Sequence, residues 1–280
     1  MNIKYFENKI IIQNAVGFDL KKTFECGQCF RFDSVGDGVF EGVAHGRLLK
    51  LSQTDNVIEI YGCDKDSFEK VFYTFFDLER DYSKIDLALQ NDKVLKDIIP
   101  FSTGIRILKQ QPFEALLSFI ISASNNIPRI KKIIGLLCEN FGEPFESDGK
   151  TYYAFPTAQA LARLDINQLA VIRAGFRDKY ILDCAKKVAS GQIDLDAVSK
   201  MSYADACKTL MTINGVGQKV ADCALLYGFG FLESFPKDVW IKRILQTLYN
   251  TDTSDGLDFF GYDGIAQQYL FYYARENKIN

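Results

Sequence analysis

A lysine and an aspartate stand at a spacing that suits nucleophilic catalysis. Lys219 comes two residues after Gly217, in the first turn of an expected helix, and Asp238 follows nineteen residues later, directly after Phe-Pro-Lys. A neutral lysine amine can attack an electrophilic carbon, and a carboxylate can stabilise positive charge that develops nearby. Taken singly, the lysine is better explained as a solvated side chain and the aspartate as a helix N-cap.

The residues before Lys219 form a glycine hairpin. Gly215, Val216 and Gly217 lie between two helical patterns, within about residues 203–228. Glycines allow a tight turn that leaves backbone N–H groups free to hold a phosphate, whatever the nucleotide sequence. Carbonyl groups of the same turn could also ligate a monovalent cation, which is a hypothesis. An ordinary helix C-cap followed by a turn is the alternative interpretation.

The elements that must position these residues begin with a predicted sheet. Short β-branched or aromatic runs alternate with turn signals, a pattern that predicts an antiparallel meander. The runs are residues 10–12, 29–32, 39–43, 48–51 and 57–61. The spacing then becomes helical, and an apolar stripe is expected to pack against the sheet. The stripe consists of Phe68, Val71, Phe72 and Phe75.

Beyond about residue 100 the pattern is helical almost throughout. Pro112 and Pro128 can each begin a helix, and Gly142 can end the second one. Further helices are expected near residues 158–164, 166–173, 178–190, 203–211, 218–228, 238–249 and 262–275. The sequence therefore predicts an α+β protein. A small antiparallel-sheet domain with helices spans residues 1–100, and an all-helical bundle that contains the hairpin spans residues 101–280.

The composition is that of an ordinary globular protein, with 48% hydrophobic and 25% charged residues. The longest apolar stretch, residues 116–123, is far shorter than the roughly 18 residues of a membrane span. The N-terminal residues do not resemble a secretory signal, so we expect a cytoplasmic protein, associated with the nucleoid if bacterial. Seven scattered cysteines indicate reduced thiols. A lone CxxC at Cys26 and Cys29 cannot complete a zinc site, so no metal is expected.

The charge is unevenly distributed along the chain. The net charge is −3, yet residues 101–220 carry 15 basic and 11 acidic side chains, a local excess of four positive charges. Residues 1–100 and 221–280 are both acidic overall. This pattern is compatible with a localised phosphate-binding face, but an excess of four charges is too small to demonstrate one.

Taken together, the hairpin, Lys219 and the Pro-Asp pair resemble the signature of base-excision DNA glycosylases of the helix-hairpin-helix superfamily. A lysine at this position marks the bifunctional glycosylase/lyase branch of that family. The resemblance implies that Lys219 displaces a damaged base from C1′ and forms a Schiff base, after which β-elimination cuts the strand. It implies that Asp238 stabilises positive charge on the ribose. No cysteine follows Cys223, so the iron-sulfur cluster of another branch is not expected.

Two segments resemble the base pocket of the 8-oxoguanine glycosylase/lyases. The chain resembles a bacterial member of the eukaryotic-type branch of these enzymes. Gly27 falls in a Gly-Gln-x-Phe-Arg-like segment, whose glycine carbonyl accepts the N7 hydrogen that 8-oxoguanine has and guanine lacks. Gln267 and Phe271 fall in the C-terminal helix that bonds and stacks on the base, and their i, i+4 spacing allows both to face one pocket. Cys223 or its neighbour is implied to cover the other face of the base. A core role for Phe271 is the alternative.

Two further segments resemble the parts of that family that contact duplex DNA. In residues 122–130, Asn126 is expected to fill the gap left by the flipped base and Arg129 to read the opposite cytosine. In residues 175–180, Phe176 is expected to wedge into the duplex and Arg177 to add a second cytosine contact. A helix-start loop and a core phenylalanine are the plain alternatives. Trp240 stands where eukaryotic members have histidine, and a phosphate contact is expected there.

The resemblance implies a monomeric enzyme that acts on damaged double-stranded DNA and needs no cofactor. One alternative is another glycosylase of the superfamily, either monofunctional or acting on alkylated purines or oxidised pyrimidines. The lysine argues against the monofunctional alkylpurine enzymes, and the absent cluster cysteines argue against the iron-sulfur branch. The second alternative is a non-catalytic helix-hairpin-helix DNA-binding protein. Nothing in such a module requires the lysine, the aspartate and a purine pocket together.

Overall fold

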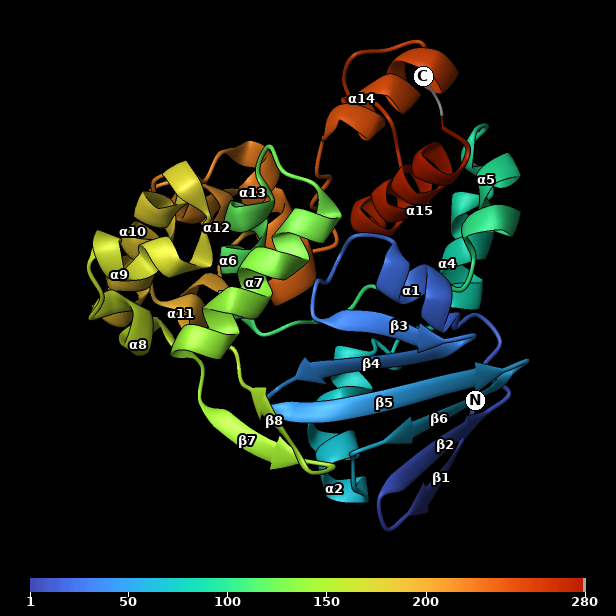
Figure 1. Ribbon diagram of the computed structural model, residues 1–280. Coiled ribbons are helices and arrows are strands. Elements are labelled where there is room, and N and C mark those ends of the chain that lie inside the picture. Colours follow the sequence, from blue (N-terminus) through green and yellow to red (C-terminus); the bar gives the residue numbers. More distant parts are fainter. Residues whose placement is uncertain (279–280) are drawn as a thin grey trace.

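A six-stranded antiparallel sheet forms the N-terminal part of the computed structural model, which describes residues 1–278 (Figure 1). Its strands lie in the order β1-β2-β6-β5-β4-β3. They are β1 (Asn2–Phe6), β2 (Lys9–Gln13), β3 (Phe32–Gly36), β4 (Val39–Ala44), β5 (Arg47–Thr54) and β6 (Val57–Tyr61). The predicted meander is confirmed for β4, β5 and β6, whereas β1 was not predicted.

The buried face of the sheet follows the period of two in the sequence. Ile10 and Ile12 of β2 pair with Ile60 and Ile58 of β6, and all four side chains are fully buried. A helical segment covers this apolar row, and Phe68, Phe72 and Phe75 of the predicted stripe are buried in it. The segment consists of α2 (Lys65–Ser67), the π-helical turn η1 (Phe68–Phe72) and α3 (Tyr73–Phe75). The N-terminal sheet domain therefore has a core of its own.

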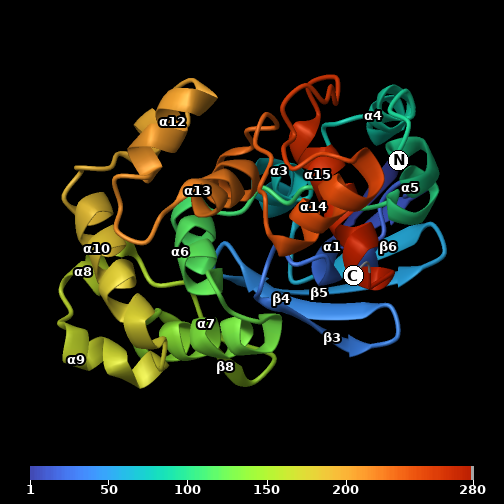
Figure 2. The same ribbon diagram turned by 90° about the horizontal axis from the view of Figure 1, so that it is seen from above.

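Helices are the main regular structure of the remaining chain, as predicted beyond about residue 100 (Figure 2). They are α1 (Leu20–Glu25), α4 (Tyr82–Leu89), α5 (Leu95–Ser102), α6 (Pro112–Ser122), α7 (Ile127–Phe141), α8 (Ala158–Ala162), α9 (Ile166–Leu169), η2 (Ala170–Ile172), η3 (Gly175–Arg177), α10 (Asp178–Ala189), α11 (Leu195–Val198), α12 (Tyr203–Leu210), α13 (Gln218–Ala224), η4 (Leu225–Phe229), α14 (Val239–Ile244), η5 (Leu245–Tyr249) and α15 (Asp263–Glu276). Pro112 occupies the first turn of α6, and Gly142 is the C-cap of α7. The proline and glycine signals thus marked true helix ends.

Two local expectations were wrong. The run at residues 29–32 was expected to be a strand, but β3 begins only at Phe32. Arg31 O still accepts from Val43 N of β4 at 3.3 Å, whereas the turn before Arg31 is bonded through the Gln28 side chain to the chain segment after α5. The helical unit also contains a two-stranded hairpin that was not predicted, β7 (Pro144–Ser147) with β8 (Lys150–Tyr153). Its turn is Asp148-Gly149, and both residues have positive φ.

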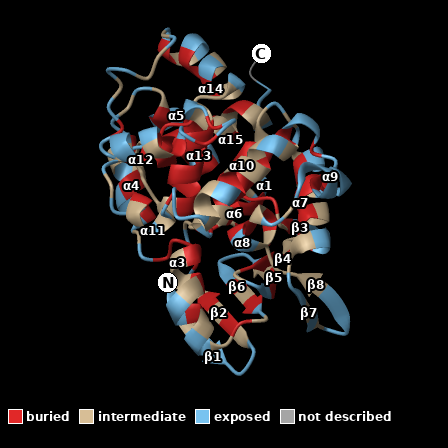
Figure 3. Ribbon diagram, turned by 90° about the vertical axis from the view of Figure 1, so that its left-hand side faces the viewer, coloured by how far each residue is buried: buried red, intermediate tan, exposed pale blue. Residues whose placement is uncertain are grey.

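Buried apolar residues fall into two clusters. The smaller cluster lies between the sheet and the helical segment 65–75, and the larger one lies among the helices (Figure 3). By packing, α4 and α5 belong to the larger cluster although they begin before residue 100, since Tyr82, Leu89 and Ile98 are buried in it. Within the larger cluster, α6 packs against α13.

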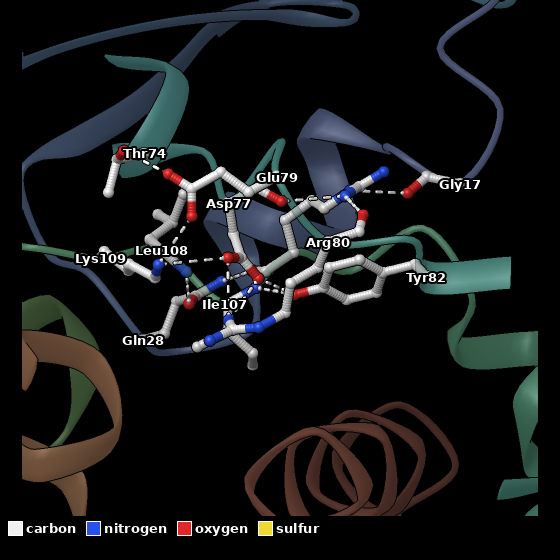
Figure 4. Close-up of polar contacts among 11 residues, drawn as sticks. Gly17, Gln28, Thr74, Asp77, Glu79, Arg80, Tyr82, Ile107, Leu108 and Lys109 are labelled. Atoms are coloured by element: carbon white, nitrogen blue, oxygen red, sulfur yellow. Dashed lines mark hydrogen bonds and ion pairs between the residues drawn. The ribbon is translucent and has the colours of Figure 1, made fainter. Parts of the chain in front are cut away.

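A buried ionic network joins the two parts of the chain (Figure 4). Asp77 is fully buried and accepts hydrogen bonds from Arg80 at 2.8 Å and from the Tyr82 hydroxyl at 2.8 Å. Lys109 lies 3.8 Å from the same carboxylate and 3.1 Å from Glu79. A buried carboxylate is tolerated only with such partners. The network therefore fixes the segment after α5 against the end of the sheet domain.

Within residues 1–278, no helix combines the length with the apolar composition that crossing a bilayer requires.

Candidate active site

The glycine hairpin connects α12 to α13 as expected. Gly215 has φ +82°, and a Cβ there would lie 2.5 Å from ring carbons of Tyr180, so only glycine fits. Val216 is buried, and its N–H already donates to Ile213 O at 3.1 Å. Among residues 1–278, the N–H groups of Gly215 and Gly217 donate no backbone hydrogen bond, so these groups and those of the first turn of α13, before the bond from Ala221 N to Gly217 O, are open to a phosphate. The phosphate and cation roles of the hairpin stay predictions.

Lys219 is the second residue of α13 and is half-buried. Its Nζ lies 5.4 Å from the centroid of the Phe119 ring, which in turn stacks on Tyr227 with centroids 5.2 Å apart. Cys223 lies one turn further along α13. Burial raises the pKa of the Cys223 thiol to about 11, although the charge and the hydrogen bond of Lys219 lower it. The thiol beside the amine is therefore neutral at neutral pH.

Asp238 is the N-cap of α14. Its Oδ1 accepts a hydrogen bond from Ile241 N at 2.9 Å, which is the capping geometry expected from the sequence. Burial raises the pKa of the carboxyl above its ordinary value, while the bond from Ile241 and the charge of Lys219 act in the opposite direction. The aspartate therefore holds its own helix and also faces the lysine electrostatically.

One cavity gathers the residues predicted to meet the base. It has a volume of about 60 Å³ and lies between the end of α1, the start of α13 and α15. Its lining contains Lys219, Asp238, Cys223, Gly27, Gln267 and Phe271. Phe119, Tyr227 and Pro236 also line it. Sequence reasoning missed Phe119, because one phenylalanine in an apolar helix carries no signal of a site.

The two sides of the cavity are well suited to a flat ligand with hydrogen-bonding edges. Gly27 has φ +80°, and a Cβ there would lie 3.5 Å from the ring of Phe271, so this glycine and that ring face each other closely. Gln267 is 4% exposed, and its Oε1 has no hydrogen-bond partner among residues 1–278. An unpaired buried acceptor costs about 1 to 3 kcal/mol, which a ligand that donates to it would recover.

A wider groove opens from this cavity. Its volume is about 560 Å³, and it shares Gly27, Lys219, Asp238 and Phe271 with the cavity. Residues 122–127 form one wall of the groove. The remaining lining includes Lys237, Trp240, Lys242 and Arg275. Trp240, expected to contact a phosphate, thus lies beside the cavity, in the first turn of α14. Positive side chains therefore flank the entrance to the cavity.

The loop before α7 and the first turn of α7 hold the two residues expected to meet the space vacated by a flipped base. Asn126 is the N-cap of α7, and its Oδ1 accepts a hydrogen bond from Arg129 N at 3.0 Å. Its side-chain oxygen is therefore engaged within the protein. Arg129 is exposed in the first turn of the helix. At the tip of the loop, Ser124 is exposed and has φ +50°.

Phe176 and Arg177 differ sharply in exposure. Phe176 is 57% exposed, whereas Arg177 is 2% exposed. The guanidinium of Arg177 donates to Ala123 O at 2.6 Å and to Ser124 O at 2.9 Å, and its Cζ lies 4.3 Å from the centroid of the Phe176 ring. Arg177 thus ties the exposed phenylalanine to the loop at residues 122–126. The cytosine contact expected for it would require these bonds to open.

Every cysteine of the chain is a buried free thiol. Within the described residues, no group of three or more His, Cys, Asp or Glu side chains could hold a metal ion.

The fold and the site together define a class of protein. Its features are a sheet domain followed by a helical unit, and a hairpin lysine that faces a helix-capping aspartate. The sequence profile of the HhH-GPD superfamily of base excision DNA repair proteins matches residues 117–257, and the chain belongs to that superfamily. The profile of the 8-oxoguanine DNA glycosylase N-terminal domain matches residues 9–116, which makes the chain a member of the 8-oxoguanine DNA glycosylase branch.

Several relatives resemble the chain. The N-glycosylase/DNA lyase of Saccharomyces cerevisiae is 36% identical over 189 residues, which cover 60% of this chain and 50% of the yeast protein. The match thus spans about half the length of that relative. A probable N-glycosylase/DNA lyase of Methanothermobacter thermautotrophicus is 31% identical and aligns with 75% of this chain and 76% of its own length.

The solved structures extend the likeness over the full chain. Clostridium acetobutylicum 8-oxoguanine glycosylase/lyase, in complex with dsDNA containing cytosine opposite to 8-oxoG, is 37% identical. Its TM-score is 0.94, over 100% of this chain and 99% of that one. The 3-methyladenine DNA glycosylase of Archaeoglobus fulgidus has a TM-score of 0.76 at 17% identity, over 96% of this chain and 99% of its own, and shares the fold alone.

Proposed function

We propose that this protein is a bifunctional DNA glycosylase and lyase that excises 8-oxoguanine opposite cytosine from double-stranded DNA. The observation that supports it best is the single cavity that contains Lys219, Asp238, Gly27, Gln267 and Phe271. These residues come from three distant parts of the sequence. A non-catalytic DNA-binding protein has no need of such a cavity, and the N-terminal match to the 8-oxoguanine DNA glycosylases favours this lesion over an alkylated purine.

The lysine supplies the nucleophile. The Lys219 amine attacks C1′ of the flipped nucleotide, and the bond from C1′ to the base breaks with its electron pair leaving on the base, which then takes up a proton. Opening of the sugar ring, with a proton moving from the amine nitrogen to the ring oxygen, gives a Schiff base. Loss of the C2′ proton then expels the 3′ phosphate by β-elimination and cuts the strand.

The neighbours of the lysine assist in different ways. The Asp238 carboxylate stabilises the positive charge that develops on the sugar as the base departs. Cys223 presents a neutral thiol, because burial keeps its pKa near 11. The Lys219 Nζ lies over the ring of Phe119, 5.4 Å from its centroid, so one side of the amine faces an apolar surface. Lys219 therefore meets the sugar from a partly apolar wall with a single carboxylate nearby.

The base is recognised by its edges and its face. The Gly27 carbonyl accepts the N7 hydrogen of 8-oxoguanine, whereas guanine would present a lone pair to it, a difference of about 1 to 3 kcal/mol. The unpaired amide oxygen of Gln267 accepts from the pairing edge of the base. Phe271 stacks on one face and Cys223 covers the other.

The groove accommodates the duplex around the flipped nucleotide. Phe176 wedges into the stack, and Arg129 reads the cytosine left without a partner. Asn126 borders the vacated space while it caps α7, and Arg177 holds the loop and the wedge together. The first turn of α13 and Trp240 contact phosphates. A monomeric state and a cytoplasmic location, with association to the nucleoid in a bacterium, are part of this proposal.

Borohydride trapping tests the proposed function. The protein is incubated with a duplex that contains 8-oxoguanine opposite cytosine, and the Schiff base is reduced to a stable adduct. We expect an adduct that disappears in Lys219→Gln and persists in Lys208→Gln, a matched change of an exposed lysine on α12. Strand cleavage without any adduct would refute the lysine mechanism. Adduct formation only on a duplex with an alkylated purine would refute the lesion.

A further inference from the structure

Three buried glutamines surround the turn that carries Gly27. Gln28 is 0% exposed, Gln110 is 7% exposed and Gln268 is 1% exposed. They come from the turn itself, from the segment after α5 and from α15. A buried amide is costly unless its donor and acceptor both find partners, so the partners of these three side chains reveal what they hold.

Gln28 fixes the turn to two other segments. Its Nε2 donates to Thr23 O at 2.9 Å, within α1, and to Arg106 O at 2.8 Å. Its Oε1 accepts from Leu108 N at 2.9 Å (Figure 4). A single side chain thus bonds the turn to the helix before it and to the extended segment between α5 and α6. Gly27 lies directly next to this anchored residue.

Gln110 and Gln268 hold the carbonyl groups on each side of Gly27. Gln268 Nε2 donates to Cys26 O at 3.2 Å, and Gln110 Nε2 donates to Gln28 O at 2.7 Å. The carbonyl of Gly27 lies between these two held groups. Among residues 1–278, no protein group donates a hydrogen bond to it. The flanking peptide groups are therefore fixed while the central acceptor stays available.

Tyr227 connects both glutamines to the helix that bears the lysine. Its hydroxyl donates to Gln268 Oε1, and its carbonyl accepts from Gln110 N at 2.7 Å. Tyr227 lies in η4, which continues α13, eight residues after Lys219. The Gly27 turn is thereby held in register with the helix from which Lys219 projects.

We propose that Gln28, Gln110 and Gln268 are positioning residues that set the discrimination between 8-oxoguanine and guanine. The inference rests on the proposed function, in which the Gly27 carbonyl reads the N7 hydrogen. A hydrogen bond weakens steeply as its distance and angle change, and recognition groups need to be held within about 0.5 Å. Gln28 and Gln110 provide that constraint from outside the cavity, and Gln268 provides it from the cavity lining.

The test compares binding rather than chemistry. In a Lys219→Gln background, the affinities for duplexes with 8-oxoguanine or guanine opposite cytosine are measured for the parent, for Gln110→Met and for Gln268→Met. Methionine keeps the length and volume of glutamine and removes the amide. We expect the ratio of the two affinities to fall about tenfold in each variant, mainly through weaker binding of the 8-oxoguanine duplex.

A third glutamine variant is the control. Gln53 also bonds backbone with both ends of its amide, to Leu20 N at 2.7 Å and to Phe18 O at 2.9 Å, but it lies outside the cavity. Gln53→Met should lower the melting temperature to a similar extent and leave the affinity ratio unchanged. With Lys219 restored, Gln110→Met should cleave an abasic duplex at the parent rate, because an abasic site has no base for Gly27 to read.

The outcomes distinguish the positioning role of the glutamines from the proposed function of the protein. If Gln110→Met and Gln268→Met both fold and keep the parent's ratio of affinities for the 8-oxoguanine and guanine duplexes, the positioning role is overturned. It is also overturned if Gln53→Met lowers this ratio as much as they do. If only one of the two variants folds, its ratio decides. A parent protein without any preference for the 8-oxoguanine duplex would overturn the proposed function and the inference with it.

Discussion

At the level of single residues, Asp238 combines two duties that substitution can separate. Its carboxylate caps α14 and faces the cavity that contains Lys219. Asparagine caps helices about as well as aspartate, whereas alanine loses about 1 kcal/mol of stability. We therefore expect Asp238→Asn to slow excision by about two to three orders of magnitude while the protein stays folded, and Asp238→Ala to lose both activity and stability. Single-turnover excision and thermal unfolding measure the two effects.

The raised pKa of Asp238 determines how the stability of the folded protein changes with pH. Burial raises the folded-state pKa above the unfolded one, so the folded protein binds the proton more tightly, and stability is lost as the pH rises through the folded pKa. At pH 7 the charge therefore costs stability, and Asp238→Asn should melt at the same temperature as the parent or higher. Excision by the parent should decline as the carboxylate protonates at acid pH. Excision near the parent rate in Asp238→Asn would remove the catalytic role.

At the level of elements, the loop before α7 and the turn η3 act as one unit because Arg177 joins them. Arg129→Ala changes an exposed side chain, so its melting temperature should match the parent, and the preference for cytosine over adenine opposite the lesion should fall.

Arg177→Ala removes a buried guanidinium with several backbone acceptors, which costs about 2 to 3 kcal/mol and should weaken binding to every duplex. If instead Arg177→Ala alters only the opposite-base preference at full stability, Arg177 reads the base directly.

The sequence predicted those elements whose signals are local. Pro112 and Gly142 marked helix ends, and runs of β-branched or aromatic residues marked β2 and β6. The hairpin of β7 and β8 carried an Asp-Gly signal of the type that favours a two-residue turn, but the surrounding helical pattern concealed it. For the candidate site, the sequence pointed to a set of residues that line one cavity in the structure: Lys219, Asp238, Gly27, Gln267 and Phe271. Phe119 and the buried state of Arg177 depend on contacts between distant segments, which spacing along the chain does not encode.

At the level of the whole molecule, the Asp77 network links the sheet domain to the helical unit. Asp77 is fully buried and has φ +52°, a backbone state that asparagine tolerates nearly as well. Asp77→Asn keeps that backbone and the shape but leaves Arg80 without its charge partner and Lys109 with Glu79 alone. We expect a loss of about 3 kcal/mol in the free energy of unfolding, measured by urea denaturation. Asp66→Asn, in an exposed pair with Lys70, should cost less than about 0.5 kcal/mol. Equal losses in the two variants would show that the network adds no stability.

The overall negative charge makes the salt dependence of DNA binding informative. The chain carries −3, yet Lys237, Lys242 and Arg275 line one groove, so a duplex held there should release few counterions, and only at that face. Three neutralised phosphates predict a slope of about −2.7 for the logarithm of the binding constant against the logarithm of salt concentration. Lys242→Ala should reduce the magnitude of the slope by about one. Lys84→Ala, which removes an exposed side chain of α4, should leave the slope unchanged. Titrations of one duplex at several salt concentrations measure both slopes. A Lys242→Ala slope equal to that of the parent would mean that the duplex follows another face of the protein, because the charge that binds DNA would then lie outside this groove.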